Sequence, residues 1–302
     1  MGKRPTIGVL IPTYCRRTYL RKVLQGLFRQ TIKADEVIVL DASPKEENLS
    51  AEEVAAFGDE LQYQPGCERG NISRQRNDAV RHSKAEILLF LDDDVEFTDT
   101  LIEDYLSAFA NTHADGITGL ILLPGEQVLN LPKTKKGSVL LWPGAPNYQA
   151  TAGVVESYVI CTASFAIKRH TLYSVGGFDE QVYGTFDDLD CGVRLWRAGC
   201  RLLHHDRPRL THLRAPCSGS RAPGFGLEWT YANLFYFQLR HFWGHRPQAL
   251  LLLALWQYCR PSRTWLAPRE VLQRAGSIRA GFLEAMRRLD QGPILPLKAS
   301  GR

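Results

Sequence analysis

The chain has 302 residues, of which 44% are hydrophobic and 23% are charged, a composition typical of a folded globular protein with a sizeable core. Its seven cysteines are odd in number and form no CxxC pair, which argues against a disulfide framework and favours reduced thiols in the cytoplasm. The net charge is +5, and no apolar run reaches the roughly 18 residues of a membrane-spanning helix.

The first 97 residues alternate apolar runs with helical patterns. Strands are expected at 7–12, 36–43 and 87–91, and helices at 17–30 and 71–83. The first run is too short for the apolar core of a signal peptide. Strands of nearly pure apolar residues, joined by helices, are typical of a parallel sheet that is covered on both faces. The sequence therefore predicts an α/β fold with a mostly parallel central sheet.

The remainder of the chain begins with a strand pattern and ends in helices. A long stretch rich in Gly, Pro, Asn and Lys lies between them, and loops of such length are usually functional. The segment "FDDLDCGVRLWRAG" predicts a helix with acids in its first turn and a stop at Gly199. The expected elements are a strand at 116–124, a loop at about 125–153, a strand within 157–169, a turn at 175–180, a helix at 186–199 and helices beyond 226.

Polar side chains stand where three of the predicted strands end. Tyr14, Asp41 and a run of aspartates after residue 91 each come just past a strand. Ligands of parallel sheets bind at the carboxyl ends of the strands, so the topology would bring these side chains together. This convergence predicts a ligand site at that edge of the sheet.

The aspartate run consists of Asp92, Asp93 and Asp94. Three adjacent carboxylates repel one another, so a folded site needs a cation to offset them. Hard oxygen ligands without nearby Cys or His favour Mg²⁺ or Mn²⁺, and either ion suits a diphosphate partner. An EF-hand is excluded because Phe97 stands where its loop needs glycine. A solvated acidic turn is the alternative that needs no metal.

Asp187, Asp188 and Asp190 form a second acidic cluster, at the start of the helix predicted at 186–199. The helix macrodipole favours acids in the first turn, which would explain Asp187 as a capping residue. Three acids in four positions exceed what capping needs. The same dipole keeps an aspartate ionised, as a general base must be.

Six motifs occur in order along the chain. They are "VLIPTYCRR", "EVIVLDAS", "RQRNDAV", "LLFLDDDVEF", "VGGFDE" and "FDDLDCGVRLWRAG". Together they resemble a family 2 inverting glycosyltransferase of the GT-A fold, of the type that builds bacterial surface polysaccharide. The resemblance covers roughly residues 5–215. It implies a GT-A domain at 1–225, with a Rossmann-like nucleotide-binding half, and a C-terminal helical extension at 226–302.

The resemblance also implies roles for single residues. Asp92 and Asp94 match the two aspartates of the DxD motif, with Asp94 on the metal and Asp92 on the metal or the ribose. Asp188 matches the aspartate of the ED motif, the base that deprotonates the acceptor, and Asp187 replaces the usual catalytic glutamate. Asp41 would lie near the base or ribose. The residues expected to bind the nucleotide sugar are Pro12, Thr13, Tyr14, Asp41, Arg76, Asn77, Asp92 and the middle aspartate Asp93.

Two further positions bear on the implied site. Residues 162–164 (Thr-Ala-Ser) stand where the family often has a Gly-x-Asn strand facing the sugar, so the sequence departs from the family here. His212 lies 24 residues after Asp188, on a predicted strand, where a histidine completes the metal site in some relatives. A single strand histidine is more often structural, so both roles of His212 stay open.

The implied reaction moves a sugar from a nucleotide-diphosphate donor, UDP- or dTDP-sugar favoured, to a hydroxyl of a glycan or glycolipid acceptor. Direct displacement needs one base on the acceptor side and one electrophile on the leaving diphosphate, and it inverts the anomeric centre. Hydrolases differ, because a carboxylate pair flanks the bond and no metal is required. One alternative is a sugar-phosphate nucleotidyltransferase, whose Gly-rich signature "IPTYCRR" lacks. The other is a non-catalytic glycan-binding protein with a degenerate transferase fold, against which the intact carboxylate set argues.

The C-terminal region is basic and aromatic. Residues 221–302 hold 12 Lys/Arg against four Asp/Glu, and aromatic residues are dense in the helix predicted at 227–244. Aromatics on all sides favour burial in a core, whereas a basic amphipathic segment could lie on a membrane surface near a lipid-linked glycan. Nucleic-acid binding has the charge but none of the motifs. The expected location is the cytoplasm, with peripheral contact at the inner face of the cell membrane as an alternative.

Overall fold

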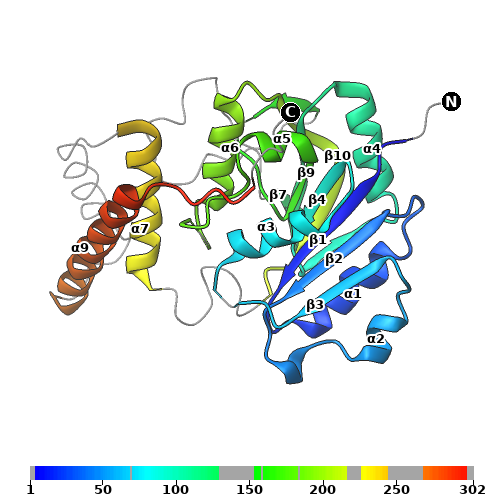
Figure 1. Cartoon of the computed structure of the whole chain (residues 1–302), viewed down its shortest axis with the longest axis horizontal. Coiled ribbons are helices and arrows are strands. Elements are labelled where there is room, and N and C mark those ends of the chain that lie inside the picture. Colours follow the sequence, from blue (N-terminus) through cyan, green and yellow to red (C-terminus); the bar gives the residue numbers. More distant parts are fainter. Residues whose placement is uncertain are drawn as a thin grey trace.

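The computed structural model describes residues 4–68, 70–128, 153–157, 159–182, 184–215, 226–243 and 268–297. Within these ranges a mixed sheet is flanked by helices (Figure 1). The strands are β1 (Ile7–Thr13), β2 (Glu36–Asp41), β3 (Leu61–Pro65), β4 (Ile87–Leu91), β5 (Val95–Phe97), β6 (Gly116–Leu123), β7 (Gln127–Val128), β8 (Val154–Glu156), β9 (Ser164–Lys168) and β10 (Leu202–His212). The helices are α1 (Arg17–Leu27), the 3₁₀ turn η1 (Lys45–Glu47), α2 (Ala51–Ala55), α3 (Ile72–His82), α4 (Leu101–Thr112), α5 (Arg169–Ser174), α6 (Asp187–Arg197), α7 (Leu227–Gln238), the π-helical η4 (Leu239–Trp243) and α9 (Pro268–Gln291).

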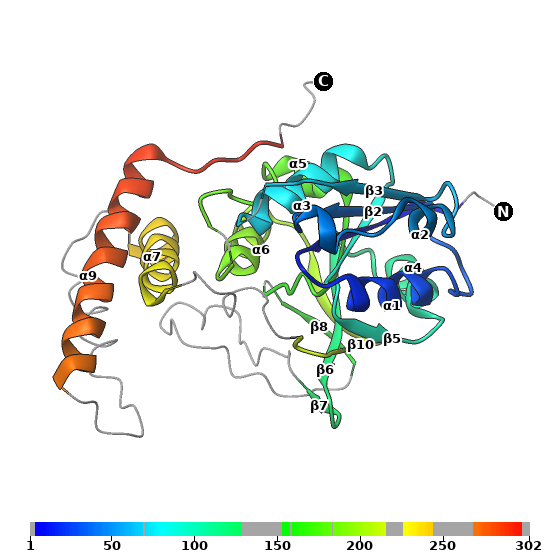
Figure 2. The ribbon, with the colours of Figure 1, turned by 90° about the horizontal axis from the view of Figure 1, so that it is seen from below.

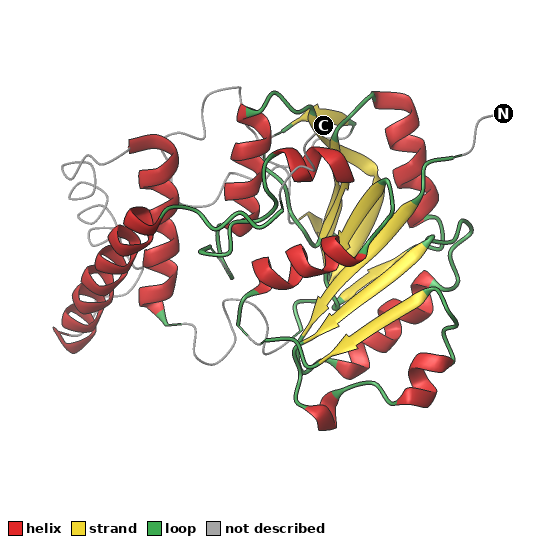
Figure 3. Cartoon of the chain, viewed as in Figure 1, coloured by secondary structure: helices red, strands yellow, loops and turns green. Residues whose placement is uncertain are grey.

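The sheet has the strand order β3-β2-β1-β4-β9-β6-β10-β5. The first four strands are parallel, and β10 is parallel to β6. β9 lies between β4 and β6 and is antiparallel to both, so β6 and β10 run in the same direction as the first four strands. The predicted α/β fold with a mostly parallel sheet is therefore confirmed (Figure 3).

Alternate side chains of β1 enter two different cores. Ile7, Val9 and Ile11 belong to the core that contains α1 and α4. Leu10 belongs to the core that contains α3 and α6. Successive strand side chains point to opposite faces, so a strand covered on both faces must be apolar throughout. β4 meets this requirement, because none of its five side chains is more than 3% exposed.

Most of the predicted elements of the first half are present, with ends that differ by a few residues. β4 spans the predicted residues 87–91, and α3 begins and ends one residue inside the predicted helix. The sequence did not predict β3, α2 or α4. Most of the loop expected at 125–153, and a helical pattern at 246–260, fall outside the described residues.

α7 and α9 lie side by side at one end of the molecule (Figure 2). They share a small core that includes Tyr231, Phe235 and Ile278, so the aromatic side chains of α7 are largely buried, as their density favoured. After α9 the chain runs back to the sheet, where Leu297 is 2% exposed and its N–H donates to the Gly176 carbonyl at 3.2 Å. Among the helices in the described ranges, none combines the length and the apolar character needed to cross a membrane.

Candidate active site

Three side chains with metal-binding atoms meet at the carboxyl end of β4. Asp92 and Asp94 follow that strand, and His212 is the last residue of β10. Antiparallel pairing of β10 with β5 places His212 opposite Val95, directly beside the aspartates. One ligand atom from each of Asp92, Asp94 and His212 lies within 4.8 Å of the other two. The structure thus brings together the three residues that the sequence predicted as metal ligands.

The chemistry of this cluster fits a divalent ion. The Asp94 Oδ2 atom accepts a hydrogen bond from the Ala215 N–H at 2.7 Å. Its Oδ1 atom is buried, accepts no hydrogen bond from the described residues, and lies 3.3 Å from the Arg16 guanidinium and 3.7 Å from His212 Nε2. Two carboxylates and one imidazole suit Mg²⁺ or Mn²⁺, since the cluster contains no thiolate that would select a softer ion.

The ring of His212 is oriented by the residues that follow it. The Arg214 N–H donates to Nδ1 at 3.1 Å, so Nε2 carries the proton and lies 3.2 Å from Asp92 Oδ2. Burial would raise the pKa of Asp92, but the His212 hydrogen bond and two nearby arginines hold it below its usual range. Binding of an ion through Nε2 would therefore require the neutral ring with its proton on Nδ1, which would release the Arg214 N–H from that nitrogen.

Asp93 points away from the metal cluster. Its carboxylate accepts from the Thr13 hydroxyl at 2.6 Å and from the Arg16 guanidinium. Burial raises the pKa of Asp93 to about 6, although Arg16 opposes this rise. Arg16 also lies 3.3 Å from Asp94 and donates to the Ala215 carbonyl, so it connects the end of β1 to the metal cluster. Thr13 and Asp93 bond each other here, and a contact of either with the nucleotide stays a prediction.

Arg76 of α3 lies between the two acidic clusters. Its guanidinium donates to Asp187 and lies 3.8 Å from Asp188 and 3.9 Å from Asp92. The side chain is 5% exposed and rests over the Phe178 ring, 5.6 Å from the centroid. A buried guanidinium needs carboxylate partners, because an unpaired charge is costly to remove from water. Arg76 thus links the metal cluster to the first turn of α6.

The first turn of α6 presents Asp187 and Asp188 to this arginine. Phe186 precedes the helix with φ of 68°, a left-handed conformation that a bulky residue rarely adopts. The Thr162 hydroxyl donates to Asp188 Oδ1 at 2.8 Å, and the Thr162 N–H donates to Oδ2 at 3.2 Å. Burial, followed by the charge of Asp187, raises the pKa of Asp188 to about 7. The Asp188 side chain is 27% exposed, so a substrate can reach it. Its pKa suits a group that accepts a proton near neutral pH.

The residues expected to hold the nucleotide lie at the ends of β1 and β2. Pro12 and Asp41 are buried, and Tyr14 is half-buried. The Asp41 carboxylate accepts from the Tyr63 hydroxyl at 2.5 Å and from the Ser43 N–H at 2.8 Å. These three side chains share one edge of the sheet with Asp92, and their contact with a nucleotide stays a prediction.

The Asn77 side chain is buried and bonded inside the protein. Its amide donates to the Phe178 carbonyl at 2.9 Å and to the Glu180 carboxylate at 3.1 Å, and its oxygen accepts from the Phe178 N–H at 2.9 Å. These bonds hold the turn at 175–180 against α3, beside Arg76. A direct contact of Asn77 with the donor stays a prediction.

Sequence reasoning assigned no role to Arg16, and at Thr162 it noted only a departure from the Gly-x-Asn strand with which the family faces the sugar. The Arg16 guanidinium supports both Asp93 and Asp94, and Thr162 holds the carboxylate of Asp188. Arg16 stands in the quoted motif "VLIPTYCRR", immediately before a helix, so a search for a counter-charge to the aspartate run could have found it. Nothing local in the sequence connects Thr162 to Asp188.

Residues 8–175, just over half of the chain, match the model of the family described as Glycosyl transferase family 2. The chain belongs to this family. In this glycosyltransferase the matched region includes Arg76, Asp92 and Asp94 and ends before Asp188 and His212.

Two relatives of this glycosyltransferase are much longer than the chain. It is 25% identical over 244 residues to the uncharacterized protein y4gI of Sinorhizobium fredii, and 24% identical over 221 residues to the O-antigen biosynthesis protein RfbC of Myxococcus xanthus. The alignments cover 72% and 69% of this chain. They cover only 26% and 17% of the relatives, so the chain spans about a quarter of the length of one and about a sixth of the other.

Solved structures resemble the glycosyltransferase over nearly its whole length. GalNAc-T7 with UDP, GalNAc and Mn²⁺ aligns with a TM-score of 0.62 and 14% identity, over 99% of this chain and 60% of that one. The mannosyltransferase PcManGT of Pyrobaculum calidifontis, in complex with GDP-Man and Mn²⁺, aligns with a TM-score of 0.53 and 17% identity, over 97% and 77% of the two chains. At such identities the likeness concerns the fold, and it confirms the expected GT-A fold.

Proposed function

We propose that this family 2 glycosyltransferase moves a sugar from a nucleoside-diphosphate donor to an acceptor hydroxyl, with inversion of the anomeric centre. The observation that carries the proposal is the position of Asp188 across Arg76 from the Asp92–Asp94–His212 cluster. Direct displacement needs a base on the acceptor side and a cationic site on the leaving-group side. The two acidic clusters offer these two sites on either side of one guanidinium.

Asp92, Asp94 and His212 are the residues that would hold Mg²⁺ or Mn²⁺. A bound ion neutralises negative charge that develops on the leaving diphosphate. Support comes from the three ligand atoms that lie within 4.8 Å of one another and from the Mn²⁺ named for both solved structures above.

Asp188 acts as the general base in this proposal. Its carboxylate accepts the proton of the acceptor hydroxyl while that oxygen forms a bond to the anomeric carbon and the bond to the diphosphate breaks. Thr162 fixes the orientation of the carboxylate through two hydrogen bonds, and Asp187 holds Arg76 close enough to favour the ionised form. Inversion follows because a single displacement forms no covalent intermediate.

UDP- or dTDP-sugars are the favoured donors, and a glycan or lipid-linked glycan is the favoured acceptor. The Asp41 carboxylate at the nucleotide edge is an acceptor that matches a base N–H or a ribose hydroxyl, and it does not by itself distinguish uracil or thymine from guanine. The relative from Myxococcus xanthus is named for O-antigen biosynthesis, which supports a surface-polysaccharide product. We place this reaction in the cytoplasm, with the basic C-terminal region as the part that would meet the inner face of the cell membrane.

The test measures donor binding and hydrolysis across UDP-, dTDP- and GDP-sugars, with Mn²⁺, with Mg²⁺ and with EDTA. Wild type is compared with Asp94→Ala and Asp188→Asn, and Asp99→Asn serves as the control because its carboxylate is 58% exposed. We expect Asp94→Ala to lose metal-dependent donor binding. Asp188→Asn should keep donor binding and lose about 10²–10⁴-fold in turnover, the usual contribution of a general base.

Two outcomes would contradict the proposal. Absence of binding to every nucleotide sugar, with or without metal, would overturn the transferase function. Equal turnover of Asp188→Asn and Asp99→Asn would remove Asp188 as the base and leave the metal site standing.

A further inference from the structure

A buried ionic cluster lies on the side of α6 that faces away from Asp188. Residues 188 and 190 are separated by about 200° around a helix of 3.6 residues per turn, so Asp190 points to the opposite side. Asp190 is 0% exposed and is bonded by Arg194 at 2.8 Å, by Arg240 at 3.0 Å and by His241 at 2.7 Å. Burial opposes its ionisation, yet these partners hold the pKa of Asp190 well below its usual range.

Arg240 joins Asp190 to a second buried carboxylate. Its Nη1 atom donates to Asp179 as well as to Asp190. Asp179 also accepts from the Tyr236 hydroxyl at 2.9 Å and from the Ile294 N–H at 3.0 Å. Arg240 belongs to η4, the π-helical continuation of α7, and π-helical turns occur frequently at functional sites.

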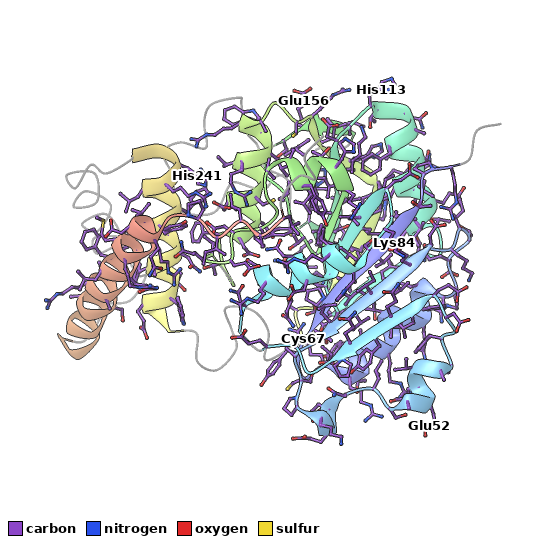
Figure 4. The ribbon with its side chains drawn as sticks, viewed as in Figure 1. Glu52, Cys67, Lys84, His113, Glu156 and His241 are labelled. Atoms are coloured by element: carbon purple, nitrogen blue, oxygen red, sulfur yellow. The ribbon has the colours of Figure 1, made fainter. Side chains whose placement is uncertain are left out.

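His241 takes part in the cluster as a neutral ring. Arg197 Nη1 lies 3.2 Å from His241 Nδ1, and a guanidinium can only donate, so Nδ1 accepts and Nε2 donates to Asp190. Burial lowers the pKa of His241, which agrees with this neutral form. Figure 4 shows His241 on the side of α7 that faces α6. Among the described residues, the charges of Asp179 and Asp190 are therefore balanced by Arg194 and Arg240, and loss of Arg240 would remove one of these two counter-charges.

Asp190 belongs to the helix that carries Asp188, and Asp179 belongs to a turn that is bonded to the helix that carries Arg76. Asp190 is on α6, two residues after Asp188. Asp179 is in the turn whose neighbours, Phe178 and Glu180, bond Asn77 of α3. Arg76, the residue that precedes Asn77, pairs with Asp187. Arg240 therefore ties α6 to the turn that is bonded to α3, so it connects indirectly the two helices whose side chains meet in the active site.

We infer that Arg240 is a positioning residue for the base Asp188, through which the C-terminal helices fix α6 relative to α3. The inference rests on the proposed function of Asp188. It gives the C-terminal region a role in the reaction, although this region lies beyond the residues that match the family model. A small displacement of α6 would move Asp188 relative to the acceptor, while Asp92 and Asp94 on the sheet would stay in place.

The test uses the full chain with Arg240→Met, Arg240→Lys and a matched control, Arg288→Met. Arg288 is a second buried arginine of the C-terminal helices, 2% exposed, whose side chain donates to Glu284 of its own helix, to the Gln181 carbonyl and to Asn233. Each variant is assayed for kcat, for the KM of the donor, for thermal stability and for hydrogen exchange of the α6 amides. Both Met variants are expected to lower thermal stability.

We expect Arg240→Met to lower kcat on the order of ten- to a hundredfold, as misplacement of a reacting group does, with the KM of the donor changed less than about threefold. The α6 amides should exchange faster. Arg240→Lys keeps the positive charge and should restore most of kcat. Arg288→Met should keep kcat per folded molecule and the α6 exchange of wild type.

The inference is overturned if Arg240→Met and Arg288→Met differ from wild type only in thermal stability, because Arg240 would then be merely structural. Failure of the proposed function has a different result: wild type itself would transfer no sugar from any donor. In that case α6 exchange still decides the inference, since faster exchange in Arg240→Met alone supports a positioning contact and unchanged exchange refutes it.

Discussion

The charge state of one carboxylate, Asp188, depends on four neighbouring influences. Burial and the charge of Asp187 raise its pKa, whereas Arg76 and the two Thr162 hydrogen bonds lower it, and the result is a pKa of about 7. Only the ionised form can accept a proton. Activity should therefore increase as pH rises through this pKa and level off above it.

Thr162→Val is expected to move the acidic limb of the kcat profile to higher pH. Valine keeps the shape and the backbone N–H but removes the hydroxyl donor, so the carboxylate is less stabilised and its pKa rises. A hydrogen bond to a charged group contributes about 1.5 kcal/mol or more, which corresponds to roughly one pH unit. The measurement is kcat between pH 5 and 9. Thr162→Ser retains the hydroxyl and should leave the limb in place; an equal shift in both variants would contradict the assignment.

Backbone conformation at the ends of elements shapes the site as much as the side chains do. Among the described residues other than glycine, Cys15, Phe186 and Arg214 are three of five with positive φ. Cys15 follows β1, Phe186 precedes α6 and Arg214 follows β10, so each one flanks a part of the candidate active site. Strained backbone of this kind persists where the surrounding structure enforces it, commonly at functional sites.

Gly177→Ala is expected to lower the free energy of unfolding by about 1–3 kcal/mol. Gly177 has φ of 79°, and a Cβ atom there would lie 2.6 Å from Asn77 Oδ1 and 2.7 Å from Leu297 Cδ1. The control is Gly276→Ala in α9, where a Cβ atom meets nothing within 4 Å. Alanine inside a helix should stabilise by about 0.5–1 kcal/mol. Urea unfolding of both variants measures the difference, and a loss at Gly276 equal to that at Gly177 would refute the steric argument.

Whether an element could be predicted from the sequence depended mainly on how many of its faces are buried. β4 is buried throughout, and its apolar run was identified with its bounds. β3 is an edge strand in which only Leu61 is buried, so it has neither an apolar run nor a clear alternation. α4 carries buried residues at helical spacing, among them Leu101, Tyr105 and Ala108, although the expected elements include no helix there.

At the scale of the whole molecule, the sequence predicted the acidic residues of the two clusters but not the side chains that bond to them. Asp92, Asp94 and Asp188 stand in local motifs next to strong elements, so the topology sufficed to bring them near one another. The bond of Thr162 to Asp188 spans 26 residues and that of Arg240 to Asp190 spans 50. Any of the chain's 37 basic residues could have paired with a given aspartate, so only the fold decides between them.

The return of the chain after α9 gives the last prediction, because it joins the C-terminal helices to the main core. Leu297 is 2% exposed and packs with Ala79, Val80 and Phe178, whereas Ile294, three residues earlier, is 48% exposed. Leu297→Ala should therefore lower the free energy of unfolding by about 2–5 kcal/mol, the cost of a cavity in a core. Ile294→Ala should change it by no more than about 0.5 kcal/mol.

Both variants are compared with wild type by urea unfolding, in which a shift of the midpoint at constant slope reports stability alone. A small and equal effect of the two changes would show that the segment is not held against the core in solution. A large effect at Leu297 alone would mean that Leu297 holds the C-terminal segment against the turn at 175–180, over Gly177. Arg240 contacts the same turn through Asp179, so the C-terminal helices would be attached to this turn at two points. The helices could then not shift without moving the turn that holds Asn77 beside Arg76.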